Sequence, residues 1–176
     1  MLTYKQLWED VVGILNQGVT DMGIVGYNVR KANQSNLLTR HKTGLILLDL
    51  VDAIHYGWQS HTDFTRGDTL KHREELIVSY EFQLTILEPQ TTEEYSTAED
   101  VATLLSMWFQ SSKTIEAFRK KGYGIYRIQH ISLPHTSSDS DLYEITPALG
   151  IMIETVQVLE SDLQHIAGIT GEVKGE

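Results

Sequence analysis

The sequence ELIVSYEFQLTIL, residues 75–87, has the clearest pattern in the chain. Apolar and polar side chains alternate along it, and Ile77 and Leu87 are the exceptions. Successive side chains of a strand point to opposite faces, so the pattern predicts a strand with one buried face. The opposite face carries Glu75 and Glu81 and is expected to meet water or a partner. The buried face comprises Leu76, Val78, Tyr80, Phe82, Leu84 and Ile86.

The residues before this strand predict the other half of a long β-hairpin. Residues 43–55 contain LILLDLV, which is apolar on both faces and suits a central strand, although a buried helix stays possible for so short a run. Residues 56–69 are polar and rich in turn formers, so we expect a loop there with its tip near residues 63–68. The returning strand is expected from Leu70 to Pro89.

Capping signals predict three helices. The first begins at the capping box Thr3-x-x-Gln6 and is expected to end at Gly18. The second follows the capping box Ser96-x-x-Glu99, and a third is expected over residues 113–121. The spacing of apolar residues in the first two gives each helix one buried face.

The rest of the chain predicts further strands. They are expected at residues 23–30, 123–133 and 142–160, with a turn at 137–141 and an interruption of the last strand at Pro147, because proline removes a ladder donor. The order of elements predicts an α+β fold, with a mainly antiparallel sheet, a long β-hairpin and two or three helices packed on one face. Residues 1–160 are expected to form a single domain, and residues 161–176 a flexible tail or one that orders on assembly.

The charge balance argues against a dedicated nucleic-acid reader. There are 14 Lys and Arg against 24 Asp and Glu, a net charge of −10, whereas phosphate binding depends on cationic side chains. An acidic lumen would instead let DNA pass without sticking. The chain has no cysteine, no apolar run near the ~20 residues of a membrane helix and no signal-peptide pattern at its start. We therefore expect a protein made in the cytoplasm with no membrane partner.

No catalytic constellation is found in the sequence. There is no His-Glu-x-x-His, Gly-x-Ser-x-Gly or phosphate-binding loop. His55 and His61 could approach His72 across the hairpin, but a structural or solvated role is favoured for them. We expect no enzyme activity, no cofactor and no metal.

The long hairpin, the long last strand and the tail form extended surface that no catalytic motif explains. Trp58 sits among polar residues near the hairpin, where an exposed tryptophan could anchor an interface. The tip could reach a neighbouring subunit, and the face with the glutamates could line a lumen. The candidate interface residues are Trp58, Phe64, Arg66, Asp68, Glu75 and Glu81.

Three stretches carry a resemblance to a known family: residues 69–84, 118–124 and 143–153. With the order of elements, they make residues 3–160 resemble the neck or tail-terminator (tail-completion) proteins of tailed bacteriophages. The resemblance implies a homo-oligomeric ring, usually of six subunits, at the neck of the virion. Such a ring caps the tail tube, joins it to the head–tail connector or adaptor, contacts sheath subunits if the tail is contractile, and lets genome DNA pass through its lumen without specific binding.

Two alternatives stay open at this point. A head-completion adaptor or a tail-tube subunit would share the layout, and a tube subunit would stack into long polymers. A small α+β ligand-binding or enzymatic domain would instead use His55, His61 and His72 as a pocket.

Overall fold

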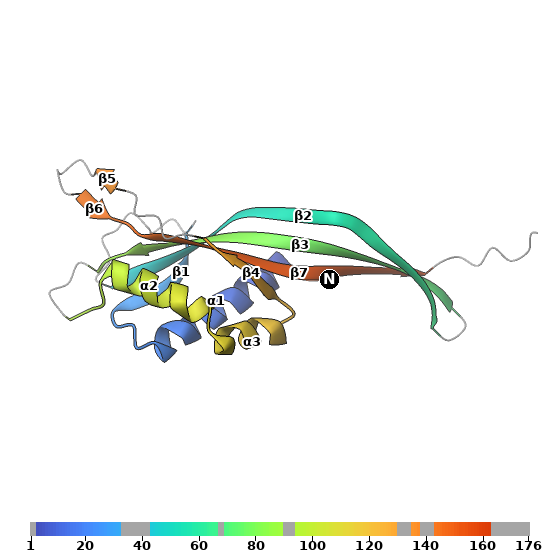
Figure 1. Cartoon of the computed structure of the whole chain (residues 1–176), viewed down its shortest axis with the longest axis horizontal. Coiled ribbons are helices and arrows are strands. Elements are labelled where there is room, and N and C mark those ends of the chain that lie inside the picture. The colour runs from blue at the N-terminus through green and yellow to red at the C-terminus, as the bar shows by residue number, and fades with distance from the viewer. Residues whose placement is uncertain are drawn as a thin grey trace, which may run out of the picture.

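A sheet with three helices on one face forms the body of the molecule, and part of the sheet projects far beyond the helices (Figure 1). The computed structural model describes residues 3–32, 43–66, 69–89, 94–129, 135–137 and 143–162. The helices are α1 (Tyr4–Asp21), α2 (Ala98–Phe109) and α3 (Ser112–Lys120). The strands are β1 (Tyr27–Lys31), β2 (Gly44–Arg66), β3 (Thr69–Leu87), β4 (Gly124–Ile128), β5 (His135–Ser137), β6 (Tyr143–Ile145) and β7 (Ala148–Asp162).

The five-stranded sheet has the order β1-β2-β3-β7-β4. The pair β1–β2 is parallel, and the other neighbours are antiparallel. Strands β5 and β6 form a separate antiparallel pair. This arrangement confirms the predicted α+β class, the mainly antiparallel sheet and the long hairpin.

The alternating strand lies at the centre of the core, as predicted. Val78, Tyr80, Phe82, Leu84 and Ile86 of β3 are buried toward the helices. All three helices contribute buried side chains to the same cluster, so the apolar face of one strand organises the whole body.

Helix α1 begins where the sequence predicts and ends later than predicted. The Thr3 hydroxyl caps it by accepting from the Gln6 amide at 3.2 Å. The expected stop at Gly18 is wrong, because Gly18 is a packing position: a Cβ there would lie 2.6 Å from the Trp108 ring. The helix continues for three residues, and Gly23, with φ +64°, follows its end.

Helix α2 is capped one residue from the predicted position, and α3 has an N-cap that was not predicted. Thr97, one residue after the expected Ser96, caps α2 by accepting from the Asp100 amide at 3.2 Å. Ser111 caps α3 in the same way through the Thr114 amide at 3.3 Å. Gly122, with φ +83°, follows the end of α3.

The hairpin differs most from the expectation. Residues 56–66, expected to form a loop, continue β2 in register with β3 as far as the pair Arg66↔Thr69. Two irregularities bend β2: Val51 is an extra residue beside the ladder, and residues 57–59 stand opposite the single residue Leu76. The polar composition of residues 56–66 therefore belongs to a solvent-exposed ladder, and residues 67–68 of the predicted tip lie outside the described part.

The last strand is broken where proline predicts. Thr146 and Pro147 separate β6 from β7, and the Pro147 carbonyl accepts from the Ile86 amide at 3.0 Å. Strand β7 reaches Asp162, two residues beyond the predicted end of the domain. Residues 130–134, the predicted turn from 138 and the tail from 163 lie outside the described residues.

Candidate interaction surfaces

A three-stranded arm projects from the body. It comprises residues 56–66 of β2, 69–77 of β3 and 156–162 of β7, and Figure 1 shows it extending past the ends of the helices. None of its described side chains is buried, whereas β3 is largely buried from residue 78 onward. The arm is therefore held by ladder hydrogen bonds and cross-strand pairs, with no core of its own.

An apolar row crosses the outer face of the arm, which is the face turned away from the helices. Tyr56, Ile77 and Val156 are direct neighbours in the register of β2, β3 and β7. Their exposed fractions are 41, 48 and 53%. Three adjacent large apolar groups left half-exposed in a row are unfavourable in water and suit contact with another protein surface.

Paired charges cover the outer face nearer the tip. Arg73 lies 2.6 Å from Glu75 and 3.9 Å from Glu160, and Lys71 lies 2.6 Å from Asp162. The contacts with Glu160 and Asp162 link β3 to β7 across the ladder. Each exposed pair adds little stability, but together they favour one register of the two strands.

Both edges of the arm are open within the described part of the chain. Strand β1 covers β2 only as far as Leu48, and β4 covers β7 only between residues 151 and 154. Beyond those points each outer strand presents unpaired backbone groups along one side. Such edges invite pairing with another chain, and long ones are usually protected in monomers.

The inner face of the arm carries a cluster of histidines and carboxylates. His61 of β2 stands opposite Glu74 of β3, and Asp63 stands opposite His72. The two imidazole rings stack with centroids 5.5 Å apart. Hydrogen bonding to Asp63, with a smaller contribution from Glu74, raises the pKa of His72 above its ordinary value. His55, the third histidine of the predicted pocket, pairs with Val78 further along the strand and does not join them.

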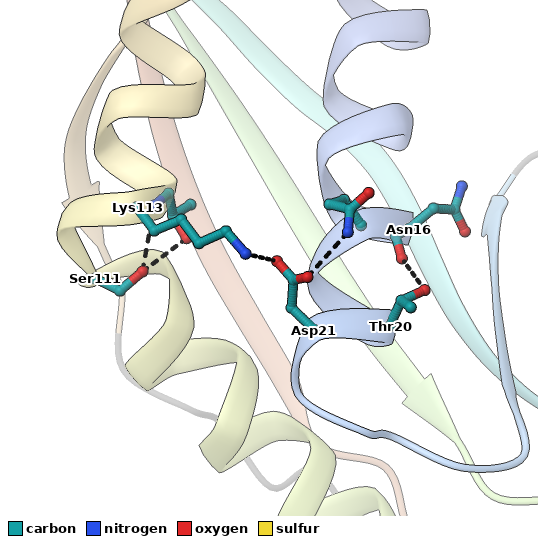
Figure 2. Close-up of polar contacts among 7 residues, drawn as sticks. Asn16, Thr20, Asp21, Ser111 and Lys113 are labelled. Carbon is teal, nitrogen blue, oxygen red and sulfur yellow. Dashed lines mark hydrogen bonds and ion pairs between the residues drawn. The ribbon is translucent and has the colours of Figure 1, made fainter.

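A groove between α1 and α3 forms a second surface. Its volume is about 270 Å³, and Gly13, Ile14, Ala117 and Trp108 line it. Figure 2 shows Lys113 of α3 reaching Asp21 of α1 at one end, where the ion pair measures 2.6 Å. This contact ties the two helices together.

A buried carboxylate lies at the groove. Asp10 is 8% exposed, and it accepts from the Tyr123 hydroxyl at 2.9 Å and pairs with Lys121 at 3.0 Å. Burial alone would raise the pKa of Asp10, but the hydrogen bonds from Lys121, Tyr123 and Gln6 together outweigh it and hold the pKa below its usual value. These contacts join α1 to the end of α3 and have a structural role.

The predicted interface residues are spread along the sheet. Phe64 and Arg66 lie near the tip on the outer face, with Phe64 opposite Lys71. Glu75 forms an ion pair with Arg73, and Glu81 accepts from the side-chain amide of Gln129 at 2.7 Å. Trp58 lies in the irregular segment of β2, but its side chain is outside the described part, as is Asp68.

The apolar row was not predicted from the sequence. Ile77, which breaks the alternation of its strand, is the centre of the row. The signal for the row in the sequence was this apolar residue on the polar face of the predicted strand. Its neighbours could be identified only with the register of β2 and β7.

Together these features define a class of protein. The described residues form a small core, a long unsupported arm with open edges and an exposed apolar row, which is the anatomy of an assembly subunit. None of the helices in the described part is long and apolar enough to cross a membrane.

The family described as E217 gateway protein gp29 matches residues 6–164. The chain therefore belongs to this family, and it is a structural protein of bacteriophage particles. The match covers nearly the same range as the resemblance drawn from the sequence. No curated protein matches the chain.

Proposed function

We propose that this protein forms a closed ring at the head–tail junction of a phage particle, where it terminates the tail tube and joins the tail to the head connector. The ring is expected to be a hexamer, on the strength of the resemblance to tail-terminator proteins. The name gateway protein, borne by the matched family, is in keeping with a passage for DNA at that junction.

The single observation that carries the proposal is the arm with two open edges. Strands β2 and β7 both run antiparallel to β3, so they run in the same direction. In a cyclic assembly the β2 edge of one subunit would meet the β7 edge of the next in a parallel pair. Such a head-to-tail contact closes into a ring when the rotation between subunits allows it.

The charge of the chain supports a passage for DNA. A subunit with net charge −10 brings a large negative charge to a ring of several copies. The two described cations on the outer face of the arm's β3 are paired with carboxylates. The excess negative charge of the subunit, carried at the lumen of such a ring, would repel phosphate rather than bind it.

The experiment is a measurement of mass by light scattering over a concentration series, with negative-stain images of the same fractions and of fractions mixed with tail tubes. Single closed rings, alone or on tube ends, are expected. Ile77→Ser should weaken ring formation more than about fivefold, because it removes the centre of the apolar row. The unfolding free energy of the subunit should fall by no more than about 1.5 kcal/mol, because the lost side chain is only half-buried and serine has a lower strand propensity than isoleucine.

Met107→Gln is the matched control. Met107 is 66% exposed on α2, a helix of the body rather than the arm, and its replacement should leave the assembly unchanged. A protein that stays monomeric even with tail tubes present would overturn the ring. An equal loss of ring formation in both variants would overturn the proposed role of the arm in the contact between subunits.

The alternative within virion structure is a tail-tube subunit or head-completion adaptor. The same open edges favour it, because edge pairing could serve any ring of the particle. Long stacks in the images would identify a tube subunit, and rings that bind connectors but never tube ends would identify an adaptor.

A further inference from the structure

The cluster on the inner face of the arm has the composition of a metal site. The His61, His72 and Glu74 side chains each offer one ligand atom, and these three atoms lie within 4.8 Å of one another. Two imidazoles and one carboxylate suit Zn²⁺ and neighbouring transition metals, whereas Mg²⁺ and Ca²⁺ prefer oxygen ligands alone.

The spacing already approaches that of a coordinated ion. In a tetrahedral zinc site with bonds of about 2.1 Å, ligand atoms stand about 3.4 Å apart. Glu74 Oε1 lies 3.2 Å from His72 Nε2 and 3.7 Å from His61 Nδ1. Both distances are close to that spacing, and the His61 ring would turn out of its stack with His72 so that both imidazoles face one ion.

A fourth residue supplies the outer support that metal-bound histidines use. Asp63 Oδ1 lies 2.5 Å from His72 Nδ1. Because a carboxylate can only accept, Nδ1 donates this hydrogen bond. On the other side of the ring, Nε2 donates to Glu74 Oε1 at 3.2 Å. A bound ion would replace that proton, and the bond to Asp63 would keep Nε2 directed at Glu74 and the centre of the cluster. A carboxylate on the distal nitrogen is the usual partner of a zinc-bound histidine, and it increases the basicity of the ligating nitrogen.

We propose that His61, His72 and Glu74 bind one Zn²⁺ ion on the arm, with Asp63 as the orienting partner of His72. Three protein ligands leave the fourth position to water or to a group on another subunit. The ion links β2 to β3 on the tip side of the irregularity at residues 57–59, where no described helix backs the sheet. Binding stabilises the arm and fixes the register of the hairpin, because only the paired strands bring the ligands together.

The test is titration of the full chain, stripped with a chelator, by Zn²⁺ in a calorimeter, followed by substitution with Co²⁺ for absorption spectroscopy. One ion per chain with a micromolar or tighter dissociation constant is expected, together with a visible Co²⁺ spectrum of four-coordinate intensity. His72→Gln and Glu74→Gln should each weaken binding at least about tenfold, and Asp63→Asn should weaken it less than either.

His55→Gln is the matched control, since His55 lies on the same strand outside the cluster, and it should bind Zn²⁺ as the unchanged protein does. Circular dichroism of each variant without metal checks that the sheet is retained. Nitrogen-15 NMR of the imidazoles should assign the bond to Nδ1 of His61 and Nε2 of His72. Zinc binding that survives His72→Gln, or falls equally with His55→Gln, would overturn the site.

Discussion

Two glycines on α1 have opposite roles that only packing distinguishes. Gly18 lies beneath the Trp108 ring, and a Cβ there would meet ring atoms at 2.6 to 2.7 Å. Gly13, on the same helix, faces the α1–α3 groove, and a Cβ added there would meet nothing within 4 Å. The same substitution at the two positions therefore separates helix propensity from steric fit.

Gly18→Ala is expected to lower the free energy of unfolding by about 1–3 kcal/mol, because the buried indole must shift to admit the methyl group. Gly13→Ala is expected to raise it by up to about 1 kcal/mol, because alanine is the better helix former and the site is open. Chemical denaturation of the two variants measures both effects. Equal changes in the unfolding free energy of the two variants would show that the Trp108 ring moves aside without an energetic penalty.

Asp10 should make stability depend on pH in the acid range. Its pKa is lowered in the folded state from an ordinary value of 3.8, so the carboxylate contributes stability that is present above that value and is lost as pH falls through the folded-state pKa. Asp10→Asn should therefore destabilise the protein at pH 7, and the difference from the unchanged chain should shrink below about pH 4.

The expected loss at pH 7 is about 1–3 kcal/mol, because Lys121 loses its ionic partner and the buried hydrogen bonds weaken. Denaturant unfolding at a series of pH values measures it. Glu9→Gln, on the exposed side of the same helix, should cost less than about 0.5 kcal/mol at pH 7, since its ion pair with Lys5 is long and solvated at 3.8 Å. A difference for Asp10→Asn that stays constant down to about pH 2 would contradict the assigned role.

At the scale of elements, the sequence was informative wherever burial shaped it. The alternation in β3 predicted its strand and its buried face, because a face packed under helices must be apolar at every second residue. The capping patterns located the helix starts within a residue or so, because each unsatisfied amide there needs a nearby acceptor. These signals are local and can be read without knowledge of the fold.

The outer half of β2 could not be predicted, because its stabilising interactions come from other strands. Residues 56–66 are mostly polar and contain turn formers, yet they pair with β3 through most of their length. Ladder bonds and cross-strand pairs hold them, and neither leaves an apolar period in the sequence. The His61–His72–Glu74 cluster was missed in part for the same reason, since the irregularity at residues 57–59 sets which histidine faces Glu74.

Stability is distributed unevenly between the body and the arm of the molecule. The body has a continuous core between the three helices and the sheet, whereas the arm has exposed side chains on both faces. A long arm of this kind is poorly suited to an isolated protein, because its edges can recruit any exposed strand. Assembly would convert that liability into the contact between subunits, and a bound ion on the inner face would hold the hairpin in register beforehand.

Amide hydrogen exchange should display this division and identify the surface used in assembly. In the isolated subunit, amides of residues 78–86 in β3 should exchange slowly, because they are paired on both sides within the body. Outward-facing amides of residues 56–66 and 156–162 should exchange fast, because no described strand covers those edges. If the subunits form the proposed ring, both edges should gain protection together, since each contact would join β2 of one copy to β7 of the next. Protection that appears instead along the α1–α3 groove, with the arm unchanged, would show that subunits meet through the helices and that the open edges serve another partner.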